Sequence, residues 1–329
     1  MKITMYGTRG SIPTPSTKKQ STVEFGGNTT CIYLEADDGT KHIIDAGSGI
    51  RVLGLDMLRD GYNGKSGKKA SLYISHTHWD HIQGLPFFAP AYIPGNDIHI
   101  YGEAKIKING GSRTNLRMEH DLERTMNGHS DAPSLLLSVD DIGLRKTLEY
   151  QQNSRNFPAS LDMLAGITQY YDFMPETGAI YLSDTLRVET MNVNHPGGCI
   201  AYRFTEYKKD GTTAIAIVNT DFEPELGWLK KMTNWWNNAD IVIADGQYEP
   251  ETSTTGINTF KKGWGHSDFE TDLDIAKLAG AKKLLLTHHE PTMDDSYHLD
   301  LENRAKMYSK AGDYNVKVEL AREGLSYII

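Results

Sequence analysis

The stretch SHTHWDH, residues 75–81, constrains this chain more than any other part of its sequence. It follows the apolar run ASLYI, which predicts a buried strand. In extended backbone the side chains of His76, His78 and Asp80 point the same way, and a bend after Asp80 brings His81 round to them. Buried imidazoles without partners leave ring nitrogens unsatisfied, and protonated ones repel each other. We therefore expect a divalent metal here, with an incidental polar loop as the alternative.

Composition bounds the class of protein. The chain has 329 residues, of which 39% are hydrophobic and 23% charged, as in ordinary globular proteins. No apolar run is long enough to span a bilayer, the N-terminus lacks the apolar core of a signal peptide, and the only cysteines are Cys31 and Cys199. These features predict a cytoplasmic protein without a disulfide framework. The net charge of −9 disfavours long polyphosphate partners.

Regular patterns place the strands in two groups, each followed by helices. Apolar alternation predicts strands at 2–8, 28–36, 42–45, 70–74 and 97–102, then at 179–193, 199–206, 212–220, 240–247, 282–289, 316–321 and 325–329. Helices are expected at 50–60, 225–239, 267–280 and 295–312, the third with a capping box of Ser267 and Glu270 and an end at Gly280. This order favours two packed sheets with helices outside. Residues 103–178 are expected to form a partly helical insertion, with helices over 115–126 and 157–167.

The cluster H-x-H-x-D-H resembles the signature of the metallo-β-lactamase superfamily, and further motifs follow in that family's order. HIIDAG ends its strand at Asp45, NHPGG supplies His195, VNTDFE supplies Asp221, and LLLTHHEP supplies His288. The resemblance covers nearly the whole chain. It implies an α/β fold in one domain, residues 1–329, built as a four-layer αββα sandwich of two mixed β-sheets with helices outside.

The same resemblance implies a dinuclear metal centre. It assigns one ion to His76, His78 and His195, and the other to Asp80, His81 and His288, with Asp221 bridging the two. Nitrogen and carboxylate donors of this kind suit two divalent ions, with zinc expected and manganese or iron as alternatives. Asp45 either orients a ligand histidine or only starts the turn before Gly47. His289 should point away from the cluster, because neighbours along a strand face opposite sides.

Three features resemble the phosphodiesterase branch of the superfamily, which includes the tRNA 3′-end endonuclease and a cyclic phosphodiesterase. Asp221 stands where another branch has cysteine, GWGHSDFE places His266 in a glycine-rich turn, and GGNTTC and HIQGLPFF match the branch. The implied reaction is attack of a metal-bridging hydroxide on a phosphodiester, with Asp80 and His266 as catalytic residues. His266 would contact phosphate or protonate the leaving group, and backbone N–H groups of the 267–280 helix would favour the anion. Candidate substrate contacts are Asn28, Trp79, Tyr248 and Trp264.

The acidic balance favours a small substrate such as a cyclic nucleotide over a large nucleic acid. The only basic stretch, residues 105–117, is expected to be a solvated loop. Alternatives are a thioester or lactone hydrolase of the glyoxalase II type, a tRNA 3′-end endonuclease, and a non-catalytic binding module. By analogy with the branch a homodimer is also open, and no membrane partner is expected.

Overall fold

The computed structural model describes residues 1–103, 136–137, 143–173, 179–181, 183–225, 227–251, 253, 255, 258 and 261–329. Within them the strands form two sheets. The first, in the order β15-β1-β2-β3-β4-β5-β7-β6, comprises β1 (Lys2–Gly7), β2 (Cys31–Glu35), β3 (Lys41–Ile44), β4 (Lys69–Tyr73), β5 (Asp97–Glu103), β6 (Leu136–Leu137), β7 (Ile167–Phe173) and β15 (Ser326–Ile328). The second, in the order β14-β13-β12-β11-β10-β9-β8, comprises β8 (Ala179–Tyr181), β9 (Leu186–Val193), β10 (Cys199–Tyr207), β11 (Thr213–Asn219), β12 (Ile241–Asp245), β13 (Lys283–Thr287) and β14 (Lys317–Leu320).

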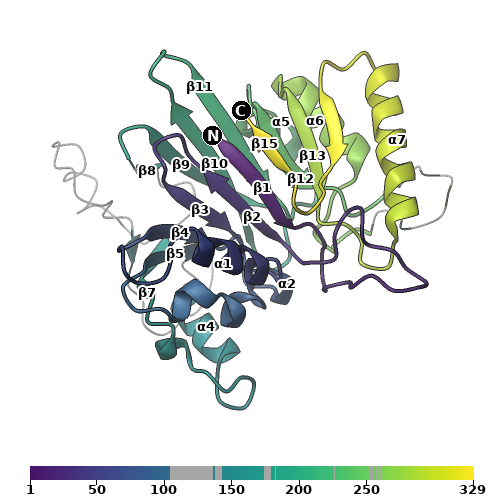
Figure 1. Cartoon of the computed structure of the whole chain (residues 1–329). Helices are drawn as coiled ribbons and strands as arrows, with labels where there is room; N and C mark the ends of the chain where they lie inside the picture. Colours follow the sequence, from purple (N-terminus) through teal and green to yellow (C-terminus); the bar gives the residue numbers. More distant parts are fainter. Residues whose placement is uncertain are drawn as a thin grey trace, which may run out of the picture.

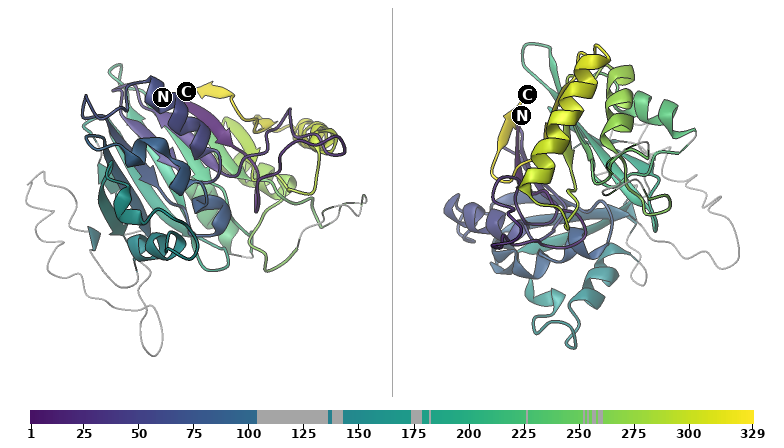
Figure 2. Two further views of the ribbon diagram at one scale, coloured as in Figure 1. Left: turned by 60° about the horizontal axis from the view of Figure 1, so that its bottom comes forward. Right: turned by 90° about the vertical axis from the view of Figure 1, so that its right-hand side faces the viewer.

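Helices cover the outer faces of both sheets. They are α1 (Ile50–Arg59), α2 (Trp79–Ile82), α4 (Leu144–Gln151), α5 (Trp228–Trp235), α6 (Phe269–Ala279) and α7 (Asp295–Ala311). Helices α1, α2 and α4 lie on the side of the first sheet, and α5, α6 and α7 on the side of the second (Figures 1 and 2). Both sheets mix parallel and antiparallel pairs, so the predicted αββα sandwich is confirmed.

Three apolar clusters fill the three interfaces between these four layers. One lies between the sheets and includes Ile3, Tyr202 and Ile243. The others lie under α1 and α4, and under α5 to α7. All five residues of β12 are buried because this strand is covered on both faces, which explains its continuous apolar run. Burying each large apolar side chain in this way contributes about 1.5–3 kcal/mol to the free energy of folding.

Parallel strands bring several loops to one edge of the sandwich. Ile44 of β3 pairs with Tyr73 of β4 in parallel register, so the segments after both strands leave at the same edge. Strands β11, β12 and β13 are also parallel, with Asp245 paired to Thr287. The two sheets are tied together at this edge, because the Ile200 N–H donates to Ser75 O at 3.0 Å.

The described part of the segment 103–178 contains helix α4 and strand β7. Strand β7 pairs with β5 in the first sheet, so part of this segment belongs to the sandwich itself. The helix expected over 157–167 is reduced to a 3₁₀ turn at Leu161–Met163. The chain then packs closely at Gly166, where a Cβ atom would lie 2.5 Å from Pro90 O. The helix expected over 115–126 lies outside the described residues. Among the described helices, none combines the length and apolar character that crossing a bilayer requires.

Candidate metal centre

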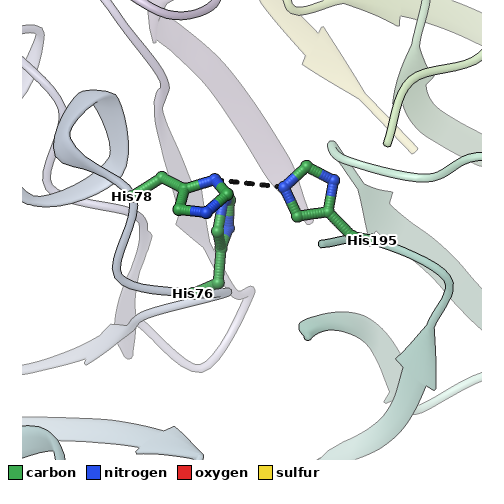
Figure 3. A group of neighbouring side chains, drawn as sticks. All are labelled: His76, His78 and His195. Carbon is green, nitrogen blue, oxygen red and sulfur yellow. Dashed lines mark hydrogen bonds between the residues drawn. The ribbon is translucent and has the colours of Figure 1, made fainter. Parts of the chain in front are cut away.

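Histidines from both sheets meet at the edge where the strands end. His76 and His78 lie on the loop after β4, and His195 lies on the loop after β9; Figure 3 shows their rings turned toward one another. His195 Nε2 is 3.1 Å from His78 Nδ1, and the ring centroids of His76 and His195 are 4.7 Å apart. One ring nitrogen from each of these three histidines lies within 4.8 Å of the others.

A second set of donors adjoins the first. Asp80 and His81 lie in the short helix α2, and His288 directly follows β13. His288 Nε2 lies 3.1 Å from Asp80 Oδ2 and 3.4 Å from His81 Nε2. Four groups have donor atoms within 4.8 Å of one another: His76, His78 and His195; His76, His81 and Asp221; Asp80, His81 and His288; Asp221, His266 and His288. All the ligands expected from the sequence are therefore brought together.

Asp221 lies between the two sets. Its Oδ2 atom is 3.7 Å from Nε2 of both His76 and His195. Its Oδ1 atom is 3.3 Å from His81 Nε2 and 3.5 Å from His288 Nε2. One carboxylate oxygen thus faces each set, which is the placement that a bridging ligand requires.

The donor chemistry fits divalent metal. His76 Nε2 and Asp221 Oδ1 are buried and have no hydrogen-bond partner among the described residues. Burial, together with the neighbouring His81, holds the pKa of His76 well below its usual value, so this imidazole is a neutral donor. Unpartnered buried polar atoms are costly, and a cation among these nitrogens and oxygens satisfies them.

The ligand histidines are oriented by contacts at their other ring nitrogen. His81 Nδ1 donates to Asp45 Oδ2 at 2.7 Å, and His288 Nδ1 donates to Gln247 Oε1 at 2.9 Å. His195 Nδ1 donates to the backbone oxygen of Gly265 at 2.8 Å. Each contact fixes the tautomer that leaves Nε2 free to face the centre. Asp45 thus contacts a predicted ligand histidine, which is one of the two roles that the sequence left open. His289 turns away, as expected, and contacts Ala321 O at 2.8 Å.

Backbone strain and close packing concentrate at this centre. Asp45 and His288 have positive φ values of 63° and 59°, which residues other than glycine rarely adopt. A Cβ atom on Gly10 would lie 2.4 Å from the His288 ring, and one on Gly265 would lie 2.1 Å from His195 Nδ1. The surrounding backbone therefore over-determines the positions of the two histidines.

His266 joins the cluster through a carboxylate that the sequence analysis did not single out. Its Nδ1 lies 2.7 Å from Asp245 Oδ2. Its ring stacks on that of His288, with the two ring centroids 4.8 Å apart. Burial lowers the pKa of His266 and raises that of Asp245. The signal for Asp245 was present in IVIADG, which, like IIDAG, ends an apolar strand on an aspartate.

The start of α6 differs from the prediction. Asp268, not Ser267, is the N-cap, and its Oδ1 accepts the N–H groups of Glu270 and Thr271 at 3.0 Å each. Ser267 instead donates through Oγ to Asp272. The predicted capping box is therefore wrong. The N–H groups of Glu270 and Thr271 are occupied by the chain's own carboxylate, so these two donors do not face a substrate anion.

The four candidate substrate contacts divide into two pairs. Trp79 and Trp264 flank the centre in the sequence and are 74% and 63% exposed. Tyr248 is only 1% exposed and packs its ring edge-on against His266, so a base cannot stack on it. The side chain of Asn28 accepts a hydrogen bond from Ser48 and donates one to Glu323, so it holds loops together. For Tyr248 the prediction of stacking is wrong, whereas a substrate contact by Asn28 stays a prediction.

Comparison with known proteins finds relatives of low sequence identity. No family model matches the chain. Its curated relatives include the ribonuclease Z of Natronomonas pharaonis, 24% identical over 88% of this chain and 86% of the relative. Another is the ribonuclease Z of Acaryochloris marina, 23% identical over 99% of this chain and 97% of the relative.

Solved structures share the fold. The metallo-β-lactamase fold protein YhfI from Bacillus subtilis superposes with a TM-score of 0.57 at 18% identity, covering 99% of this chain and 98% of that one. A diphosphatase from the PhnP family superposes with a TM-score of 0.59 at 17% identity, covering 100% of this chain and 97% of that one. These likenesses show that the chain has the metallo-β-lactamase fold, and its gathered donors lie at one edge of that fold.

Proposed function

We propose that this protein belongs to the metallo-β-lactamase superfamily and is a metal-dependent hydrolase that cleaves phosphodiester bonds and uses two zinc ions. The observation that carries the proposal is the His266–Asp245 pair, which stands beside both sets of donors. Thioester and lactone hydrolysis needs the metal ligands but does not need an additional histidine beside them that donates a proton to the leaving group. The curated relatives, which are ribonucleases Z, support the same class of bond.

The chain's own residues would divide the work as follows. A bound metal pair supplies an activated water at neutral pH and neutralises charge on the phosphate. Asp221 would hold the pair together, and Asp45, Gln247 and the Gly265 carbonyl would keep the ligand histidines in place. A catalytic role for Asp80 beyond metal binding stays a prediction.

His266 would act on the leaving group. Its Nδ1–H donates to Asp245, so Nε2 is the atom that can face substrate. A bound phosphate anion would raise the pKa of His266, which burial otherwise lowers, and would favour the protonated imidazole. That proton can then pass to the leaving oxygen. His266 also shares a donor group with Asp221 and His288, so metal binding is its alternative role.

Two substrate sizes are supported by different observations. The net charge of −9 favours a small diester such as a cyclic nucleotide. The ribonuclease Z relatives favour the 3′ end of an RNA, and this is the second candidate. Trp79 and Trp264 would stack on a base in either case.

We also propose that residues 1–329 form one domain and that the protein is a homodimer.

The experiment compares substrates on zinc-loaded protein. We expect hydrolysis of bis(p-nitrophenyl) phosphate, loss of that activity in chelator, and a decrease of roughly 10²–10⁴-fold in kcat for His266→Asn. Ready cleavage of a thioester with no turnover of the diester would overturn the proposal. A side-by-side assay of precursor tRNA, cyclic nucleotides and cyclic dinucleotides then decides the substrate size.

A further inference from the structure

A buried carboxylate that belongs to neither set of metal donors accepts hydrogen bonds from the loop that carries His266. Glu223 is 3% exposed and follows Asp221 by two residues. Its carboxylate accepts the N–H groups of Gly263 and Gly265, each at 2.8 Å. Both glycines have positive φ values, 82° and 88°, and such backbone turns successive N–H groups toward a single anion.

The loop that contains Gly263 and Gly265 contacts one residue of the centre and carries another. The carbonyl of Gly265 accepts the hydrogen bond from His195 Nδ1 at 2.8 Å, and His266 is the next residue along the chain. The backbone of Glu223 is also fixed on the other side, because its N–H donates to Asn194 O at 2.8 Å and its carbonyl accepts from Asn194 Nδ2 at 3.0 Å. Glu223 therefore joins the glycine loop to the loop of His195.

We propose that Glu223 is a positioning residue that sets both His195 and His266 by holding Gly263 and Gly265. A carboxylate is suited to this task because charge-assisted hydrogen bonds are shorter and stronger than neutral ones. Packing of a side chain at residue 265 cannot hold the loop instead, since a Cβ atom on Gly265 would strike the His195 ring. The part that concerns His266 rests on the proposed function, whereas the part that concerns His195 does not.

The test uses the full chain with Glu223→Gln. Glutamine has nearly the same shape, but it loses the charge and presents an N–H₂ group to one of the two backbone donors. The matched control is Glu302→Gln, because Glu302 is also buried, at 5% exposed, and accepts the backbone N–H of Leu320 on β14. Circular dichroism and thermal unfolding show that each variant is folded.

The first measurement is zinc affinity by competition with a chromogenic chelator. We expect Glu223→Gln to weaken zinc binding roughly 10–100-fold, as changes behind metal-ligating histidines do, while Glu302→Gln leaves it unchanged. Equal zinc affinity in Glu223→Gln and wild type would overturn the positioning of His195. This result does not depend on any enzymatic activity.

The second measurement compares leaving groups. Diphenyl phosphate releases a more basic oxygen than bis(p-nitrophenyl) phosphate and needs the proton of His266 more. We expect Glu223→Gln at saturating zinc to lose roughly 10–100-fold in kcat on diphenyl phosphate, less on the nitrophenyl ester, with KM retained in both. The double variant Glu223→Gln/His266→Asn should be no slower than His266→Asn alone.

The outcomes separate the two ideas. Equal losses on both esters, or additive losses in the double variant, would overturn the positioning of His266. Wild-type protein that binds zinc but hydrolyses neither ester would refute the proposed function, and a lowered zinc affinity in Glu223→Gln would still support Glu223 as the residue that positions His195.

Discussion

Two glycines with the same backbone conformation differ only in what surrounds them. Gly265 has a φ of 88° and its added Cβ would lie 2.1 Å from His195 Nδ1, whereas Gly211 has a φ of 84° and nothing within 4 Å. Alanine in the left-handed region costs roughly 1–2 kcal/mol at either position. Only at Gly265 does it also displace a proposed metal ligand.

We therefore expect Gly265→Ala to weaken zinc binding at least about tenfold and to abolish most hydrolysis. Gly211→Ala should lose only the roughly 1–2 kcal/mol of unfolding free energy that the left-handed backbone costs, and should keep its zinc affinity. Chelator competition and urea unfolding on the two variants check this. Wild-type affinity in Gly265→Ala would show that the loop around residue 265 adjusts freely and that His195 does not depend on it.

Individual residues were predictable where a short motif carries them. His76, His78, Asp80 and His81 lie in one strand-end motif, and alternation alone brings most of them to one face. Asp245 and Glu223 were missed because each acts through a hydrogen bond to a loop far along the chain. Tyr248 was misjudged because burial of an aromatic beside a site depends on how the neighbouring loops close over it.

At the scale of elements, α7 is fastened to the end of β14 by one carboxylate. Glu302 on α7 accepts the Leu320 N–H at 3.0 Å and hydrogen bonds from Arg322, and it pairs with Lys306 at 2.9 Å. Burial alone would raise the pKa of Glu302, but these partners lower it to about 2. The ionised carboxylate is therefore the form that holds the helix to the sheet.

This pKa predicts how stability changes in acid. A carboxyl group whose pKa is lower in the folded state stabilises the fold above its unfolded pKa of about 4.3, and loses that contribution as pH falls toward the folded value of about 2. Urea unfolding should show wild type more stable than Glu302→Gln at pH 6, with the difference shrinking between pH 4.5 and pH 2.5. A difference that stays constant across this range would contradict the assignment.

The order of the elements followed from hydrophobic periodicity, but their ends did not always. Gly280 ends α6 as expected, in the left-handed conformation at a φ of 67°. The start was misplaced by one residue, because Ser267 uses its carbonyl to accept the N–H of Tyr248. That contact draws the backbone into an extended bridge and leaves Asp268 to cap the helix.

At the scale of the whole molecule, the candidate centre joins the two halves of the sandwich. His76, His78, Asp80 and His81 come from the segment after β4 in the first sheet. His195, Asp221 and His288 come from loops of the second sheet. A metal bound by both groups would therefore hold the layers together in addition to completing a reactive centre.

Removing metal should consequently lower the stability of the entire fold. A ligand at a hundred times its dissociation constant adds about 2.7 kcal/mol to the unfolding free energy. We expect a higher Tm with zinc than in chelator, and a much smaller zinc effect for His195→Ala. Thermal unfolding with and without zinc measures this. Equal Tm values in both conditions would show that the seven donors do not bind metal in the folded protein.

The division of the donors between two sheets also bears on how the protein is made. His81 and His288, whose Nε2 atoms lie 3.4 Å apart, are separated by 207 positions along the chain. During synthesis the first donors leave the ribosome long before the last one exists, and β13 must emerge and join its sheet before His288 can take its place. The full donor set would therefore form only late in the life of the nascent chain, and a metal bound earlier would have only the ligands of the first sheet.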